Sequence, residues 1–175
     1  MGKLEISKEE MLKTRVARFK ELKPTEQAFV DTRIPGYERE AFLVIGRGVT
    51  EDPALRPPIT DARDFNITVI KQAPHKRVGL HDHPTVEVFM PLSGRWAVYW
   101  GDKGENEVIL EQWDTISVPP GVMRGFTNVG TEEAYLLGIT GGSDSGHVSW
   151  APAVLEEARA TGLDLDEHGN LIAKR

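Results

Sequence analysis

The sequence predicts an all-β domain built as a sandwich or barrel. From residue 65 onward, short apolar runs alternate with turn residues at an even spacing, which is typical of such folds. The length of 175 residues suits one domain with terminal additions. The hydrophobic fraction of 39% and the charged fraction of 27% are those of an ordinary globule, not of a disordered or membrane chain.

The N-terminal segment is expected to hold one helix. Ser7 and Glu10 have the spacing of a capping box, and apolar residues follow at helical intervals up to Leu22. We therefore predict a helix over about residues 8–22, ended by Pro24. The apolar stripe of this helix indicates a lid on the domain or a dimer contact.

One strand and a stiff connection are expected before the regular strand pattern begins. Residues 41–49 have the apolar, β-branched composition of a strand. Pro53, Pro57 and Pro58 then fall within a short stretch, and such proline density favours a stiff connection over a helix.

The core of the chain contains a series of strand candidates separated by turns. Residues 93–94 and 101–104 are predicted to be hairpin-like connections, because glycine accepts the positive φ that tight turns need. The predicted strands cover residues 65–71, 78–83, 87–92, 95–100, 107–110, 115–118, 122–128 and 134–140.

The strand pattern ends at the glycine-rich stretch 141–146. Residues 152–160 suit a short helix that stops at Gly162, and an apolar tail is expected to pack back on the barrel. We divide the chain into three parts. The first part, residues 1–64, holds the helix, strand and proline-rich connection and packs on the barrel. The second part, residues 65–141, is the core. The third part, residues 142–175, holds the C-terminal helix and tail.

Charge and composition exclude several classes of function. The net charge of -6, without clustered Lys and Arg, argues against nucleic-acid binding. The chain has no cysteine, which excludes disulfides, iron-sulfur clusters, thiolate zinc sites and cysteine nucleophiles. The N-terminus lacks the apolar core of a secretion signal, and no window approaches the roughly 20 apolar residues of a membrane span. We expect a cytoplasmic protein without a membrane or nucleic-acid partner.

Two histidines and a glutamate form a candidate metal site. His81 and His83 are two residues apart on a predicted strand, so both imidazoles point to the same face. Pro84 ends or bends that strand, and Glu87 opens the next one with an oxygen ligand. Two imidazoles and one carboxylate leave coordination positions open, as at non-haem iron sites. A His-x-His pair by itself is also compatible with polar loop residues near a turn.

A second stretch makes the metal hypothesis more specific, and here the chain resembles the cupin family. The first cupin motif is met by His81, His83, Glu87 and Gly94, and the second by Pro119, Gly121 and Asn128. The resemblance covers about residues 65–141. It implies a double-stranded β-helix, the cupin jelly-roll barrel, with a metal site inside its mouth. Our fold prediction adds a short helix at each end of the chain.

Three positions depart from the cupin pattern. His75 and Trp113 stand where the two motifs begin with glycine. Arg124 stands where the family usually places its third metal-binding histidine. Arginine stays charged and has no lone pair to donate, so it cannot replace that ligand.

Arg124 leaves three alternatives open. A metal is held by His81, His83, Glu87 and waters, while Arg124 points inward and binds a carboxylate of the substrate. His147 or His75 folds back as a replacement ligand. Or the metal is lost, and Arg124 simply pairs with Glu87 inside the barrel, because a buried arginine needs an anionic partner.

Aromatic residues are expected mainly in the core, as for Trp96, Trp100 and Phe126. An inward aromatic at the mouth of a barrel would shape a pocket for a small ligand. Tyr99 and Trp113 are our candidates for this role, together with Arg124 as the substrate-binding set.

The resemblance implies a metal-dependent dioxygenase with one divalent ion, Fe(II) being favoured and Mn, Zn or Ni being alternatives. The expected substrate is a small organic molecule that bears a carboxylate. A non-oxidative isomerase, decarboxylase or lyase, and a non-catalytic ligand-binding or sensory cupin, are the competing hypotheses. Because small jelly rolls have sheet edges to cover and the family commonly pairs subunits, we expect a homodimer.

Overall fold

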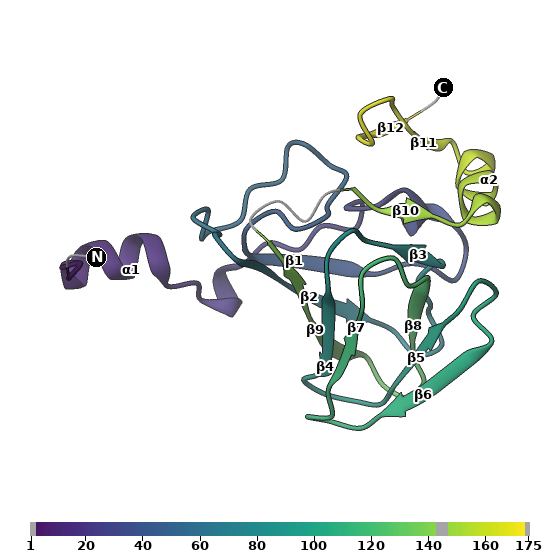
Figure 1. Cartoon of the computed structure of the whole chain (residues 1–175), viewed down its shortest axis with the longest axis horizontal. Helices are drawn as coiled ribbons and strands as arrows, with labels where there is room; N and C mark the ends of the chain where they lie inside the picture. The colour runs from purple at the N-terminus through teal and green to yellow at the C-terminus, as the bar shows by residue number, and fades with distance from the viewer. Residues whose placement is uncertain (1–2, 143–146, 174–175) are drawn as a thin grey trace.

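The structure, a computed structural model, describes residues 3–142 and 147–173 and shows two antiparallel sheets of five strands each (Figure 1). Sheet A has the order β1 (Glu40–Ile45), β2 (Phe65–Gln72), β9 (Ala134–Gly141), β4 (Glu87–Pro91) and β7 (Ile116–Val118). Sheet B has the order β10 (Ser149–Trp150), β3 (His81–Asp82), β8 (Arg124–Asn128), β5 (Trp96–Trp100) and β6 (Asn106–Leu110). Non-consecutive strands are neighbours in both sheets, so the predicted jelly-roll architecture is confirmed.

Each predicted strand of the core has a counterpart, and the largest difference concerns the strand that carries the histidines. The prediction covered residues 78–83, whereas β3 spans only His81–Asp82. Gly79 lies just before it, held by a side chain from outside the sheet, because its backbone N–H donates to Asp31 Oδ2 at 3.1 Å. Around the short strand, single backbone hydrogen bonds continue the pairing, from Val78 N–H to Phe126 O and from Ala151 N–H to Leu80 O.

The N-terminal helix is shorter than predicted. Ser7 caps α1 (Lys8–Arg15) as expected, since its hydroxyl accepts from the Glu10 N–H at 3.1 Å. The chain then becomes extended at Val16, and a 3-10 turn, η1 (Phe19–Glu21), places Phe19 against Phe42 of β1. The helix ends early because the packing of Phe19 stabilises the chain more than further helical turns would. A helix this short has little stability of its own.

In the C-terminal part the predicted helix is present, and two strands that were not predicted follow it. Helix α2 spans Pro152–Ala160 and ends before Gly162, whose φ is 83°. Strands β11 (Leu163–Leu165) and β12 (Leu171–Ala173) then form a small sheet. None of the helices in the described part of the chain has the length and apolar character needed to span a bilayer.

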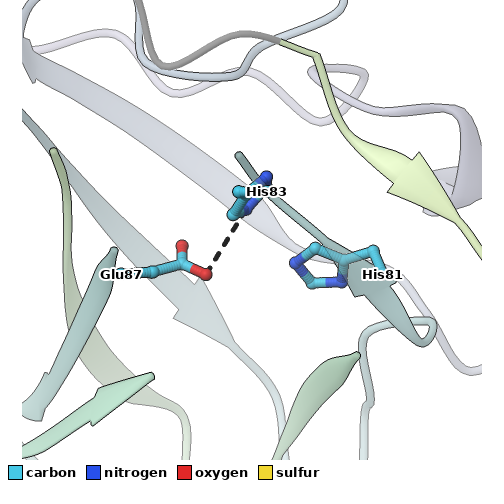
Figure 2. Close-up of side chains that lie close together, drawn as sticks. All are labelled: His81, His83 and Glu87. Carbon is cyan, nitrogen blue, oxygen red and sulfur yellow. Dashed lines mark ion pairs between the residues drawn. The ribbon is translucent and has the colours of Figure 1, made fainter. Parts of the chain in front are cut away.

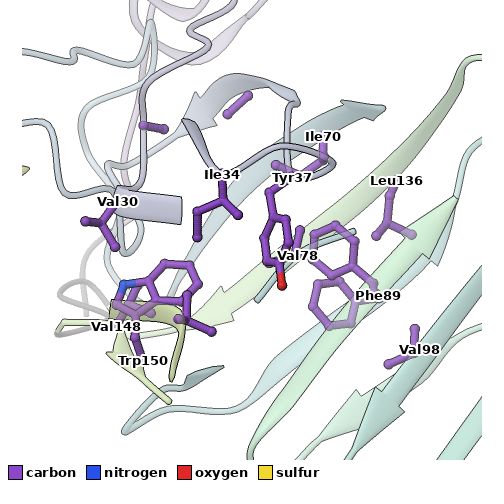
Figure 3. Close-up of a cluster of buried hydrophobic side chains, with 14 of the residues drawn as sticks. Val30, Ile34, Tyr37, Ile70, Val78, Phe89, Val98, Leu136, Val148 and Trp150 are labelled. Carbon is purple, nitrogen blue, oxygen red and sulfur yellow. The ribbon is translucent and has the colours of Figure 1, made fainter. Parts of the chain in front are cut away.

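The core fills the space between the sheets and extends under the terminal segments. Phe89 and Leu136 belong to sheet A and Val98 to sheet B. Val30, in the 3-10 helix η2 (Val30–Arg33), packs near Trp150 of β10 (Figure 3). Residues before and after the barrel therefore share one core with it, and they cover one end of the sandwich.

Two non-glycine residues have the left-handed backbone that the cupin motifs assign to glycine. His75 has φ 61° and Trp113 has φ 74°. Their N–H groups donate to Asn128 O at 2.7 Å and Pro91 O at 3.0 Å. Both turns therefore adopt the left-handed conformation although the residue carries a side chain, at a backbone cost of about 1 kcal/mol or more each.

Candidate metal centre

The three predicted ligands meet inside the molecule. His81 on β3, His83 just beyond it and Glu87 at the start of β4 are all buried, and their ligand atoms lie within 4.8 Å of one another (Figure 2). His83 Nε2 is 3.3 Å from Glu87 Oε2. The period of two along the chain places both imidazoles on the inner face, and the bend at Pro84 returns the chain so that Glu87 faces them.

His81 is held in the tautomer that a metal requires. Its Nδ1 lies 2.7 Å from Gly79 O, and a carbonyl only accepts, so Nδ1 carries the proton and Nε2 keeps its lone pair. Burial and the neighbouring His83 and Arg124 lower the pKa of His81 to about 3. The ring is therefore neutral near pH 7 and able to bind an ion.

A buried ion pair from the N-terminal segment fixes the peptide that orients His81. Asp31 Oδ2 accepts the Gly79 N–H, and Asp31 Oδ1 accepts from Arg39 Nη2 at 2.7 Å. Both charged side chains are almost completely buried. Such outer contacts set the direction of a ligating imidazole. Sequence reasoning missed this pair, because Asp31 precedes His81 by 50 residues and follows no motif.

Glu87 is ionised by its surroundings. Burial alone would raise its pKa, but His83 and Arg124 outweigh burial and lower the pKa to about 2. Arg124 Nε donates to Glu87 Oε2 at 3.0 Å, and Arg124 Nη1 donates to Val122 O at 3.1 Å. Arg124 is fully buried and lies opposite His81 in the β3–β8 register, which places it on the same inner face.

Two buried nitrogens at the centre lack a hydrogen-bond partner among the described residues. They are His83 Nδ1 and Arg124 Nη2. An unpaired buried donor costs about 1–3 kcal/mol, so each of these nitrogens is suited to bind a water or a ligand.

A small cavity adjoins the three ligands. Its volume is about 50 Å³, whereas one water occupies roughly 10–15 Å³ on this measure. The wall is mainly apolar, with threonines, Arg39 and the three ligands as its polar part. Trp150 forms one side and lies 5.1 Å from the His81 ring, centroid to centroid. The cavity suits a small ligand held by few polar groups.

The other predicted site residues lie elsewhere. Trp113 is 64% exposed on a turn, and Tyr99 faces the outside of sheet B, where its hydroxyl donates to Val78 O. Neither borders the cavity. His75 and His147 are both exposed and do not belong to the ligand group found in the described part of the chain. Arg124 is not among the residues that line the cavity, but it donates to Glu87, which is one of them.

Trp150 is positioned by a buried carboxylate that the sequence analysis did not single out. Glu51 Oε1 accepts from Trp150 Nε1 and Glu51 Oε2 accepts from the Val30 N–H, both at 2.6 Å. This glutamate links the segment before the barrel to the segment after it. Its position in a proline-rich connection offered no signal, because glutamate there is normally solvated.

The comparison with protein families identifies the central region. The family model of the cupin domain matches residues 68–140. The chain contains a cupin domain. The resemblance seen over about residues 65–141 is thereby confirmed, and the three candidate ligands fall within the matched region.

Solved structures share the cupin fold at low sequence identity. The polyketide cyclase RemF from Streptomyces resistomycificus has a TM-score of 0.60 and 15% identity, over 78% of this chain and 84% of its own. An RmlC-like cupin from Shewanella frigidimarina has a TM-score of 0.51 and 12% identity, over 73% and 90%. An oxalate oxidase has a TM-score of 0.52 and 23% identity, over 69% and 58%.

These likenesses concern the fold. This chain spans only 48% of one oxalate oxidase chain and 58% of two others. No curated protein is similar enough in sequence to match the chain. A shared fold does not fix an activity, which depends on the residues of the site.

Proposed function

We propose that this cupin is a metal-dependent enzyme, a non-haem Fe(II) dioxygenase acting on a small substrate that bears a carboxylate. His81, His83 and Glu87 would hold the ion. The observation that carries the proposal is the convergence of their three ligand atoms in a buried pocket, within 4.8 Å of one another. When bound, Fe(II) supplies open coordination positions at which oxygen and an organic substrate react.

The spacing of the donors fits a metal. Ligands that bind one ion at about 2.1 Å lie roughly 3.0–3.4 Å apart when adjacent, and His83 Nε2 is 3.3 Å from Glu87 Oε2. His81 presents a neutral ring with a free Nε2. The unpaired His83 Nδ1 fits a second-sphere water, which would fix the tautomer of that ring.

The charge of the site supports an anionic substrate. Metal-bound histidines are neutral, and Glu87 and Arg124 carry opposite charges that cancel. A divalent ion would therefore leave about two positive charges in a mostly apolar cavity. The usual neutral histidine at position 124 would leave one. Arg124 thus shifts the preference of the site toward a substrate with an additional negative charge, such as a carboxylate.

The protein residues around the pocket divide the remaining tasks. Arg124 keeps Glu87 ionised and oriented, with Nη2 left to donate toward an anion or a water. The Asp31–Gly79 contact holds the His81 ring. Trp150, Phe89 and Phe126 exclude water from the cavity and restrict its size.

Elemental analysis of the full chain, purified without tag or chelator, tests the proposal. We expect close to one divalent ion per chain, and its loss in His81→Ala because two ligands bind far more weakly than three. His168→Ala is the matched control, since it removes the same side chain from an exposed turn and should leave the metal content unchanged.

Oxygen consumption then separates the competing chemistries. The Fe(II)-loaded protein should consume oxygen with one class in a panel of aromatic and keto acids, and not with the matching amides. Turnover of the acids without oxygen uptake would identify an isomerase, decarboxylase or lyase instead. A folded wild-type chain that binds no metal would contradict the enzyme proposal altogether.

One observation favours a non-catalytic ligand-binding cupin as the second candidate. Arg124 pairs with Glu87 at 3.0 Å, which neutralises the carboxylate without an ion. In that case the cavity would bind a small molecule in the absence of metal. Metal-free protein whose melting temperature rises with a member of the acid panel is the expected result for this candidate.

A further inference from the structure

Arg39 places a permanent positive charge on the wall of the cavity. It is the single arginine among the described residues that line the cavity, and no lysine is among them. Its side chain is 2% exposed. Arg124 is not part of this wall, since it donates to Glu87 and to Val122 O. Arg39 lies outside residues 68–140, which the cupin family model matches, so this charge is a feature of the N-terminal segment.

Three contacts hold the guanidinium of Arg39 in one orientation. Nη1 donates to Tyr37 O at 3.1 Å, and Nη2 donates to Asp31 Oδ1 at 2.7 Å. Cζ lies 5.0 Å from the centroid of the Phe29 ring, which also lines the cavity. A planar guanidinium fixed in this way loses little further freedom when it binds a ligand.

Arg39 also has donors to spare. An arginine carries five N–H groups, and contacts with the described residues account for one at Nη1 and one at Nη2. Asp31 compensates the charge, which keeps the buried cation stable before a ligand arrives. The guanidinium fork matches the two oxygens of a carboxylate, so the remaining donors suit such a group.

Arg39 and the candidate metal ligands border the same small space from different sheets. Arg39 directly precedes β1 at the edge of sheet A, whereas His81 is on β3 of sheet B. Asp31 connects them, because Oδ1 accepts from Arg39 and Oδ2 accepts from the Gly79 N–H. The cavity of about 50 Å³ has room for roughly four waters at 10–15 Å³ each. This space suits a short acid and not a long one.

A surface groove on the other side of Arg39 is less suited to an anion. The groove has a volume of about 370 Å³. Its charged lining residues are four glutamates and three bases, namely Glu26, Glu38, Glu40, Glu133, Arg33, Arg39 and Lys71. Lys71 is paired with Glu40 and Glu133. The acidic majority repels an anion, which favours the cavity as the place where Arg39 binds one.

We propose that Arg39 determines the specificity of the site by binding the carboxylate of a short aliphatic acid, whose other end faces the metal position. The inference rests on the proposed function for the presence of the ion, and it adds the residue that selects the substrate. An amide has the shape of the acid without its charge. Because hydrogen bonds to charged groups are stronger than neutral ones, loss of Arg39 should weaken the acid by about 10- to 100-fold and the amide far less.

Calorimetric titration of the full chain with acetate and pyruvate, each beside its amide, tests the proposal. Loading with Zn(II) avoids redox turnover of the acids. The double variant Asp31→Asn, Arg39→Met removes both members of the buried pair and so leaves no lone buried charge. It should lose about 10- to 100-fold in affinity for the acids and little for the amides. Arg39→Lys keeps the charge without the fork and should lose less.

Arg33→Met is the matched control, because Arg33 is an exposed arginine of the groove. It should bind the acids as wild type does. An equal loss of acid and amide in the double variant would assign a purely structural role to Arg39 and overturn the proposal. Unchanged acid affinity in that variant, a comparable loss in Arg33→Met, or a wild-type chain that binds neither acid better than its amide also overturns it. If the double variant fails to fold, judged by circular dichroism, Arg39→Lys decides by the same comparison.

The same titrations on metal-free protein separate this inference from the proposed function. A chain that binds no metal but prefers the acids in an Arg39-dependent way contradicts the enzyme and supports the role of Arg39. A chain that binds metal but whose preference for acids is independent of Arg39 overturns only the inference.

Discussion

Glu87 and Glu51 are both buried carboxylates near the cavity, and their environments drive their acidities in opposite directions. Glu87 faces His83 and Arg124, and its pKa falls to about 2. Burial raises the pKa of Glu51 to about 7, against which the N–H groups of Trp150 and Val30 have only a partial effect. Asp31 raises it further, and Arg39 opposes that shift.

The pKa values of the two carboxylates differ because of their partners and not because of their depth of burial. A cationic neighbour supplies a full opposite charge, whereas a neutral donor compensates only part of the lost hydration. Glu87 is therefore ready to bind a cation at any ordinary pH. Glu51 instead fastens the segments on either side of the barrel, and its ionisation changes near neutral pH.

Arg124→Met gives the largest expected effect. Methionine leaves Glu87 charged but without the guanidinium group that pairs with it, so the free energy of unfolding should fall by about 3–5 kcal/mol. Urea denaturation in the presence of a chelator measures this without a contribution from bound metal.

Two further variants control for other causes. Arg95→Met breaks an exposed pair with Glu111 and should cost no more than about 1 kcal/mol. The double variant Arg124→Met, Glu87→Gln removes both buried charges and should recover much of the loss. A small effect of Arg124→Met alone would show that Glu87 does not depend on its ion pair.

Glu51 should make the protein less stable as pH rises from 5 to 8. Its folded pKa is above the unfolded value, so the folded state retains a proton that the unfolded chain has already lost. The contribution is complete below about pH 4 and is lost as pH rises through about 7. It amounts to about 3 kcal/mol, because each tenfold change in proton affinity is worth about 1.4 kcal/mol.

Urea denaturation across this pH range checks the effect. In Glu51→Gln the decrease in stability with pH should flatten, although the variant is less stable at pH 5 because its amide cannot accept both N–H groups. Glu107→Gln removes an exposed carboxylate and should leave the slope unchanged. An equal slope in Glu51→Gln and wild type would assign the pH dependence to other groups.

Trp113→Gly has the smallest expected effect on stability, at a turn away from both carboxylates. Glycine accepts the φ of 74° at this turn, and the indole that it removes is 64% exposed. We expect a gain of up to about 1 kcal/mol, or a melting temperature higher by about 2–4 °C. Trp113→Ala removes the same indole but keeps the Cβ, so it should not stabilise.

The amino-acid sequence alone predicted the strands of residues 65–141, the second helix and the convergence of the three candidate metal ligands. Strand periodicity and turn residues are local, and His81, His83 and Glu87 lie within seven residues, so spacing alone implies a shared face. The ranges predicted for β2, β4 and β9 agree with the structure to within one residue at each end. The departures at His75, Trp113 and Arg124 were also visible from their positions in the motifs.

Only the tertiary structure decided what surrounds the ligands and what covers the barrel. Asp31, Glu51 and Trp150 reach the site from segments far away in sequence, and no local pattern encodes contacts across 48 to 99 residues. The outward positions of Tyr99 and Trp113 and the early end of α1 also depend on contacts with residues distant in sequence. Local propensity is overridden wherever burial against distant residues contributes more free energy than the local conformation does.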